Sequence, residues 1–306
     1  LSKALLDANC KLTSIDLGGN NLTAAGAEHL SKALMHVNCK LTSISLYNNN
    51  LTAAGAKHLS NALLDANCKL TSINIRYNKL TAAGAKHLSN VLMNANCKLT
   101  SIDLRYNKLT DEGAKHLSKA LKDANCKLTR IDLSDNKLTA AGAKYLSNAL
   151  LDANCKLTSL NLTGNKLTDE GGKHLSNALK DANCQLTSLD LDVNKISSDI
   201  KETISELCTW NGKIQAFNFG DKIQGSKFMQ TCRMDIAKIV VDYLSGSSYE
   251  DTNRLQVLDG LYKKARPNKS ILFMVDKVKS KDTKKSQKRS ISNILSRFSG
   301  TAAEVS

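Results

Sequence analysis

The chain has 306 residues, and its 42% hydrophobic content is enough to build a sizeable core, which argues against a wholly disordered protein. No apolar stretch approaches the roughly 18 uninterrupted residues of a membrane span. The formal net charge is +15, and residues 261–306 alone hold 12 Lys and Arg against 3 Asp and Glu, so the basic excess is concentrated at the C-terminal end.

The cysteines reveal the organisation of the chain, because seven of them recur every 29 residues. They are Cys10, Cys39, Cys68, Cys97, Cys126, Cys155 and Cys184. Functional thiols would not fall at one fixed interval, whereas a tandem array produces this pattern. Each unit reads approximately NCKLTSIDLxxNxLTAAGAKHLSxAL. The sequence therefore predicts a stack of similar repeats.

Each repeat predicts one strand and one helix. The first repeat carries the spacing LxxLxLxxNxL at Leu12, Ile15, Leu17, Asn20 and Leu22. This is the leucine-rich repeat signature, and its alternating Ile and Leu predict a short strand with one buried face. Residues 26–34 have apolar side chains at helical spacing. Asn38, which follows that helix, is expected to adopt a left-handed backbone that ends it.

These elements predict an α/β leucine-rich repeat solenoid. It is expected to be a curved right-handed coil, with a parallel sheet on the concave face and helices on the convex face. The array is expected over residues 1–221, with a degenerate cap from about residue 198. Within the cap, the segment KIQAFNF at 213–219 repeats the strand spacing and predicts an eighth strand. A small helical extension is expected at 222–265 and a basic, flexible tail at 266–306.

The repeats resemble the ribonuclease-inhibitor-like class of leucine-rich repeats. The resemblance rests on the 29-residue length, the full helix and the Asn-Cys pair before each strand, and it covers residues 1 to about 197. Repeats of this class occur in the repeat domains of animal NOD-like receptors. Comparable near-identical arrays occur in proteins that intracellular bacteria deliver into host cells. The resemblance implies a rigid surface that binds a protein partner.

The repeated polar side chains are interpreted as scaffold. The cysteines lack the close pairs of thiolate metal sites, so we expect buried, reduced thiols and no metal. Disulfide frameworks belong to oxidising compartments, so an intracellular, cytoplasmic location is expected, which is the host cytoplasm if a bacterium secretes the protein. The asparagine at Asn20 and its equivalents is expected to bond to the backbone. The histidines are too regular for a closed metal shell. They are His29, His58, His87, His116 and His174.

The positions that differ between repeats predict where a partner binds. On the exposed side of the predicted strands, repeats two to four carry tyrosine and arginine, the residue types that dominate binding hot spots. A row of acidic and amide residues runs beside them. The candidate partner-binding residues are Tyr47, Arg76, Tyr77, Asp103, Arg105, Tyr106 and Asp132. The alternative is that Arg76 and Arg105 only pair with Asp103 and Asp132 on a solvated face.

No nucleophile elbow, Walker loop, HExxH or GxGxxG motif occurs, so neither an enzyme nor a cofactor nor a small-molecule substrate is expected. We expect a non-enzymatic protein–protein interaction scaffold, acting as a bacterial protein on host targets. Three alternatives stay open: an immune-sensor repeat fragment, a GTPase-activating repeat protein by fold analogy alone, and a protein whose basic tail contacts an anionic membrane or nucleic acid. The candidate tail residues are Lys263, Lys264, Lys284, Lys285, Lys288 and Arg289.

Overall fold

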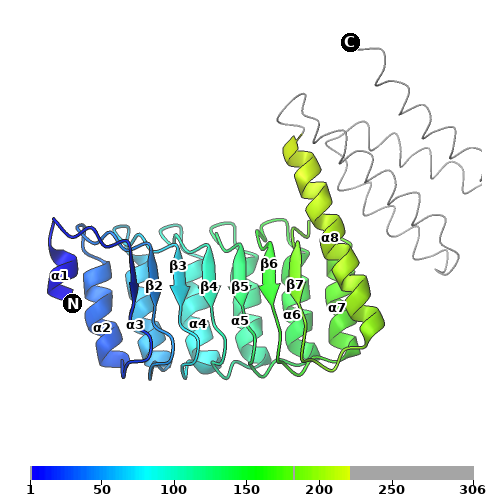
Figure 1. Ribbon diagram of the computed structural model, residues 1–306, viewed down its shortest axis with the longest axis horizontal. Helices are drawn as coiled ribbons and strands as arrows, with labels where there is room; N and C mark the ends of the chain where they lie inside the picture. The colour runs from blue at the N-terminus through cyan, green and yellow to red at the C-terminus, as the bar shows by residue number, and fades with distance from the viewer. Residues whose placement is uncertain (1, 182, 221–306) are drawn as a thin grey trace, which may run out of the picture. The chain divides into compact units, whose positions relative to one another are not determined.

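The computed structural model describes residues 2–181 and 183–220, which form a regular succession of strands and helices (Figure 1). The strands are β1 (Ser14–Asp16), β2 (Ser43–Ser45), β3 (Ser72–Asn74), β4 (Ser101–Asp103), β5 (Arg130–Asp132), β6 (Ser159–Asn161) and β7 (Ser188–Asp190). The helices are α1 (Ser2–Leu6), α2 (Ala24–Leu34), α3 (Ala53–Leu64), α4 (Thr81–Leu92), α5 (Asp111–Leu121), α6 (Ala140–Leu150), α7 (Asp169–Leu179) and α8 (Ser198–Gly220).

The strands form one parallel sheet in chain order, from β1 to β7. Each residue pairs with the residue 29 positions later, so Ile44 lies opposite Ile73 and Ile73 opposite Ile102. The helices α2 to α7 pack beside one another as a second layer on one side of the sheet (Figure 1). The predicted leucine-rich repeat solenoid of strands and helices is confirmed. We call its two surfaces the strand face and the helix face.

The core lies between the two layers and consists of the predicted apolar positions. In the fourth repeat, Leu99, Ile102, Leu104 and Leu109 are all at most 1% exposed. The helix α5 supplies Leu117 from the other side, with no exposed surface. Because every repeat places the same side chains at the same depth, each one covers the apolar edge of its neighbour and the core is continuous.

The repeated asparagines form a buried ladder along the array, as the sequence predicts. Asn136 Nδ2 donates to the carbonyl oxygens of Leu104 at 3.1 Å, Leu133 at 3.0 Å and Ser134 at 3.1 Å. Its Oδ1 accepts from the Leu109 amide at 2.8 Å. One side chain thus satisfies backbone groups of two successive repeats, which would be costly to bury without partners.

The prediction of a left-handed backbone at Asn38 is wrong. The left-handed residues lie elsewhere among the described residues, and Asn38 Nδ2 instead donates to the carbonyl of Leu6, at the end of the preceding helix, at 2.9 Å. Asn96 and Asn183 make the equivalent bonds to Leu64 and Leu151, both at 2.9 Å. These asparagines therefore satisfy the free carbonyls of a neighbouring helix end rather than ending their own helix.

The predicted eighth strand is also wrong, because residues 213–219 belong to the helix α8. Ile204, Cys208 and Asn211 recur at helical spacing and are buried against the last repeat. Asn211 Nδ2 donates to the Leu186 carbonyl at 3.0 Å and to the Leu179 carbonyl at 3.3 Å. The array is thus closed by a helix that continues the hydrogen bonding of the repeats. No helix within the described residues, α8 included, is long and apolar enough to cross a bilayer.

The column of cysteines is free of disulfides, and six of its seven thiols are buried. They are Cys39, Cys68, Cys97, Cys126, Cys155 and Cys184, whereas Cys10 at the first repeat is half-buried. Desolvation raises the pKa of the Cys155 thiol to about 11, and it also raises the pKa of Cys68, Cys97 and Cys126. The thiolate, which is the reactive form, is therefore disfavoured in the folded protein.

This burial predicts a slow reaction with thiol reagents. When the folded protein is treated with a neutral alkylating reagent near pH 7, the six buried thiols of the column and Cys208 should stay unmodified, and Cys10 should react before them. All nine cysteines of the chain should react after denaturation. Intact-mass spectrometry counts the adducts. Rapid labelling of several thiols from Cys39 to Cys184, or stoichiometric bound zinc, would contradict the assignment of this column to the scaffold.

Candidate functional site

The candidate partner-binding residues lie on the strand face, immediately after the strands. Tyr47, Arg76 and Arg105 are the second residues after β2, β3 and β4, and all three are half-buried. Tyr77 and Tyr106 follow the two arginines and are exposed by 47% and 41%. The in-register sheet brings equivalent positions of successive repeats side by side, so the side chains that differ between repeats form one surface.

Two of the tyrosines are stacked. The ring centroids of Tyr77 and Tyr106 are 4.0 Å apart, with 12° between the ring planes. Hydrogen bonds with Tyr77 and Asp135 raise the pKa of the Tyr106 hydroxyl to about 12. The hydroxyl is therefore protonated at physiological pH and engaged with its neighbours. The pair presents a large apolar surface with a polar end, which suits a binding surface.

Arg76 is the arginine of this surface that has no acid partner. Its guanidinium lies 4.9 Å from the centroid of the Tyr47 ring, a cation–π arrangement. Its Nε is buried and lacks a hydrogen-bond acceptor. None of the ion pairs among the described residues involves Arg76. The planar group is thus held in place by an aromatic ring, and no carboxylate of the described residues pairs with it.

Arg105 is committed to neighbouring carboxylates. Its Nη2 lies 2.7 Å from Asp103 Oδ2, and its Nε lies 3.3 Å from Asp132 Oδ2. The hydrogen bond to Asp103, with the nearby charge of Asp132, raises the pKa of Arg105 further. The alternative interpretation, pairing on a solvated face, therefore describes Arg105 but not Arg76. The sequence predicts the same role for both arginines, whereas in the described structure only Arg105 of the two has carboxylate partners.

The stacked tyrosines adopt a backbone conformation that tyrosine disfavours. Tyr77 has φ of 54° and Tyr106 has φ of 52°, both in the left-handed region. Glycine, asparagine and aspartate hold this position in most other repeats, namely Gly19, Asn48, Asp135 and Gly164, while Val193 holds it in the last one. A left-handed residue with a Cβ costs roughly 1–2 kcal/mol. The two tyrosines thus occupy positions that the fold alone would fill with smaller residues.

Arg130 is a further exposed cation on this sheet that the sequence analysis did not identify. It begins β5 and pairs in register with Ser101 of β4 and Ser159 of β6. The signal was present in the sequence, since this position is serine in the other strands: Ser14, Ser43, Ser72, Ser101, Ser159 and Ser188. Arg130 therefore departs from the repeat at a surface position, as the residues of the candidate site do.

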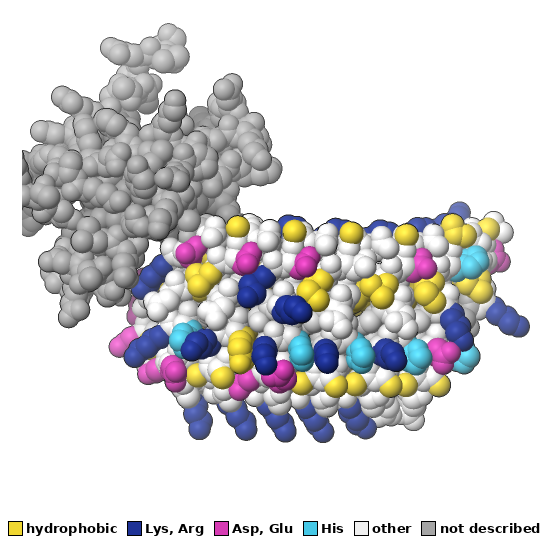
Figure 2. Space-filling model, turned by 180° about the vertical axis from the view of Figure 1, so that it is seen from behind, with side chains coloured by type: hydrophobic (Ala, Val, Ile, Leu, Met, Phe, Trp, Pro, Cys, Tyr) yellow, Lys and Arg dark blue, Asp and Glu magenta, His cyan; other side chains and the backbone are white. Residues whose placement is uncertain are grey.

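The helix face carries a regular pattern of charge. Figure 2 shows Lys and His side chains along the helices and a further row of Lys and Arg at one edge of the array. His116 and His174 each lie close to a glutamate one turn earlier, at 3.6 Å from Glu112 and 3.9 Å from Glu170. Among the described residues, no group of three or more His, Cys, Asp or Glu side chains could hold a metal ion.

The candidate tail residues, Lys263 to Arg289, lie outside the described residues, as do the predicted extension and tail beyond residue 220.

No curated protein matches the sequence. Among solved structures, leiomodin-1 actin-binding site 2 is similar, with 17% sequence identity, a TM-score of 0.47, and coverage of 54% of this chain and 94% of that chain. An internalin from Listeria monocytogenes is 20% identical, with a TM-score of 0.37 and coverage of 64% of this chain and 59% of that chain.

A family model described as Leucine Rich repeat matches six successive segments of the chain. They are residues 8–31, 37–60, 66–89, 95–118, 124–147 and 153–176. Each segment begins shortly before a strand and ends within the following helix, so the matches follow the structural repeat. Such repeats typically form non-enzymatic scaffolds for protein–protein interaction. The matched segments, the parallel sheet and the buried asparagines together identify the chain as a leucine-rich repeat protein.

Proposed function

We propose that the chain binds a protein partner on its strand face, through a surface made of Tyr47, Arg76, Tyr77 and Tyr106. We call this surface the tyrosine–arginine patch. The observation that carries the proposal is an arginine that lacks a carboxylate partner, Arg76, held over the Tyr47 ring and next in sequence to the exposed, stacked pair of Tyr77 and Tyr106. Aromatic residues and arginine in such a cluster are typical of the centre of an interface.

The chemistry of the patch defines the partner that it would fit. The two Nη groups of Arg76 can form parallel hydrogen bonds to a carboxylate, so an Asp or Glu of the partner is expected beside the guanidinium group. The Tyr77 and Tyr106 rings suit an apolar side chain beside that acid. Arg105 needs no further acid, because Asp103 and Asp132 already surround it. The proposed partner therefore presents one acidic group next to an apolar group.

Two substitutions test the patch without disturbing the fold. Arg76→Ala removes a side chain that has no ion pair in the described structure. Tyr77→Asn removes the stacked ring and keeps the left-handed backbone, because Asn48 holds the same conformation in the preceding repeat. Each change should weaken partner affinity by about 1–3 kcal/mol, which is roughly 5- to 150-fold. The thermal midpoint should stay nearly unchanged.

The measurement starts with affinity capture by the parent chain and by both variants, followed by binding titrations with the captured partner. Lys86→Ala on α4 is the matched control, because this exposed lysine lies on the helix face. The control should bind as tightly as the parent. A partner that binds Arg76→Ala and Tyr77→Asn as tightly as the parent would exclude the patch and move the interface to another surface.

We propose two further properties of the partner. It is a host-cell protein, and the chain binds it in a reducing compartment. The resemblance of the repeats to host-targeted proteins of intracellular bacteria supports the first statement. The buried, unbridged thiols support the second, since the fold needs no disulfide. Expression in cultured host cells, followed by capture with the parent and with Arg76→Ala, tests both. A partner recovered only from extracellular fluid would contradict them.

A further inference from the structure

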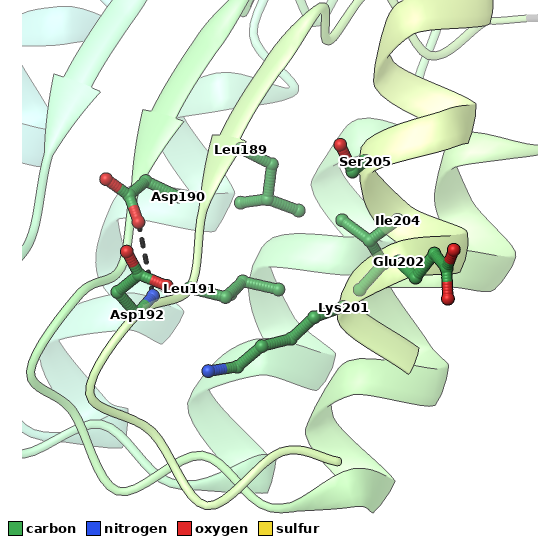
Figure 3. Close-up of a pocket in the computed structure, with 8 residues that line it drawn as sticks. All are labelled: Leu189, Asp190, Leu191, Asp192, Lys201, Glu202, Ile204 and Ser205. Carbon is green, nitrogen blue, oxygen red and sulfur yellow. Dashed lines mark hydrogen bonds between the residues drawn. The ribbon is translucent and has the colours of Figure 1, made fainter. Parts of the chain in front are cut away.

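The C-terminal end of the sheet, where the predicted eighth strand is absent, carries a cavity and an unpaired strand edge. Between β7 and the first turns of α8 there is a cavity of about 410 Å³, within the range of typical ligand pockets (Figure 3). Leu189 and Leu191 line it from the strand side, and Lys201, Ile204 and Ser205 line it from α8. All of these residues belong to the compact unit Leu1–Gly212.

The edge of the sheet in this cavity has backbone donors without acceptors. In each earlier repeat, two amides after the strand donate to the next repeat, as Leu162 does to Asp190 at 2.8 Å and Gly164 to Asp192 at 2.9 Å. The corresponding amides of the last repeat belong to Leu191 and Val193. Within the described part of the chain, neither amide has an acceptor. An unpaired edge of this kind is a template for an added strand.

The side chains at this edge also lack the cover that a further strand gives. The five residues that precede Leu189 in its column, from Ile44 to Leu160, are each 1% exposed. Leu189 is only half-buried, and Val193 is 77% exposed. An incoming strand with an apolar residue beside Leu189 would restore the burial found in every interior repeat.

The charge around the cavity is net negative, because Asp190, Asp192 and Glu202 line it against one lining cation, Lys201. This charge indicates a basic occupant. Asp190 and Asp192 are both exposed, and Asp190 Oδ1 accepts only a backbone hydrogen bond, from the Asp192 amide at 3.1 Å (Figure 3). The ion pairs of the described residues include neither aspartate. Within the array, the nearest analogue is Arg105, which lies between Asp103 and Asp132 on adjacent strands. The equivalent of those two aspartates in the last repeat is Asp190. A basic side chain of an added strand, placed beside Asp192, would therefore lie diagonally across from Asp190.

We propose that this edge binds an extended segment of a partner protein by strand addition. The segment has two apolar residues in alternation, to cover Leu189 and the cavity, and a Lys or Arg beside Asp192. Its carbonyl groups accept from the Leu191 and Val193 amides, beyond the part of the edge at Leu186 that Asn211 of α8 already covers. This site is separate from the tyrosine–arginine patch.

The probe for the test is a synthetic peptide with the sequence of residues 72–79, SINIRYNK, which begins beyond the part of the edge that α8 covers. Its alternating isoleucines match the apolar pattern, and the register of the array places its arginine beside Asp192. The peptide is titrated into the full-length protein by fluorescence anisotropy. Amide hydrogen exchange is followed at the same time, and the Leu191 and Val193 amides should exchange at least about tenfold more slowly when the peptide is bound.

Two protein variants and one peptide variant make the test specific. Ser205→Trp fills the cavity from the exposed surface of α8 and should weaken peptide binding at least about tenfold. Asn90→Trp adds the same ring to an exposed position of α4 and should change binding less than about twofold. A peptide whose arginine is replaced by glutamate should bind at least about tenfold more weakly.

Peptide binding that survives Ser205→Trp, or that leaves the exchange of Leu191 and Val193 unchanged, would overturn the proposal. A failure of the tyrosine–arginine patch proposal can be distinguished from a failure of this one. Arg76 lies outside the cavity, so Arg76→Ala should leave peptide binding unaltered. Loss of peptide binding in Ser205→Trp together with normal binding in Arg76→Ala would support strand addition at β7, whatever the outcome for the tyrosine–arginine patch.

Discussion

Asn107→Ala should lower the free energy of unfolding of the array by about 3 kcal/mol or more. The Asn107 side chain has no exposed surface. Its Nδ2 donates to the carbonyls of Ile75 at 2.8 Å, Arg105 at 3.1 Å and Leu104 at 3.2 Å, and its Oδ1 accepts from the Leu80 amide at 3.3 Å. Alanine would leave the buried Leu80 amide without an acceptor, at a cost of roughly 1–3 kcal/mol. The three carbonyls would each lose one of two donors, because Asn78, Asn136 and the Tyr77 amide still reach them, and each lost bond is worth about 0.5–1.5 kcal/mol.

Urea denaturation followed by far-ultraviolet circular dichroism measures this loss. Asn20→Ala is the matched control, because Asn20 holds the same position in the first repeat but is exposed to solvent. Asn20 Nδ2 donates to the Leu17 carbonyl at 2.9 Å and to the Gly18 carbonyl at 3.2 Å, and water can replace these bonds. Its replacement should cost about 1 kcal/mol or less. Equal losses at the two positions would contradict the role assigned to burial.

Leu104→Ala should lower the free energy of unfolding by about 2–5 kcal/mol, the usual cost of truncating a buried leucine. Leu104 has no exposed surface and lies in the middle of the array. The cavity would be shared by adjacent repeats, because each repeat is covered only by its neighbours. Hydrogen exchange should therefore accelerate in β3 and β5 as well as in β4.

Leu64→Ala is the control for this second change, because Leu64 ends α3 and is 40% exposed. It should cost about 0.5 kcal/mol, and its effect on exchange should be confined to the end of α3. A loss below about 1 kcal/mol in Leu104→Ala, or faster exchange in the fourth repeat alone, would show that the repeats fold more independently than the continuous core implies.

The structure of the repeat could be predicted in detail because the same sequence pattern recurs in every unit. The spacing of Ile102, Leu104 and Asn107 has a single reading as strand and turn, and the same spacing recurs throughout the array. Burial then follows from position alone, since equivalent residues meet equivalent neighbours. The strands β1 to β7, the helices of the repeats and the asparagine ladder lie where this spacing predicts them.

The end of the array could not be predicted in the same way, because two patterns overlap there. The segment 213–219 fits the strand spacing, but it also continues the helical spacing of Ile204, Cys208 and Asn211. No proline separates the two segments. The helix prevails in the structure, and its Asn211 takes over the bond that a repeat asparagine makes to the preceding helix end. Periodicity alone does not decide between two such continuous patterns.

The candidate site was predictable in composition but not in pairing. The sequence identifies the tyrosines and arginines as departures from the repeat, yet it does not show which arginine pairs with which aspartate. The difference arises two residues earlier, where Arg105 follows Asp103 and Arg76 follows the neutral Asn74. Arg105 pairs with Asp103 at 2.7 Å, so no carboxylate of the described residues is left to pair with Arg76. Backbone strain at Tyr77 was likewise invisible until its φ angle was known.

The asparagine ladder has a mechanical consequence. Each ladder side chain reaches back to the preceding repeat, as Asn49 does to the Leu17 carbonyl at 3.0 Å and Asn165 to the Leu133 carbonyl at 3.0 Å. Every junction between interior repeats is therefore held by nearly the same set of bonds. A chain stretched from its ends would yield at forces that differ little from one junction to the next. Each event would release one repeat of 29 residues, which is roughly 100 Å of extended chain, so the array would lengthen in even steps.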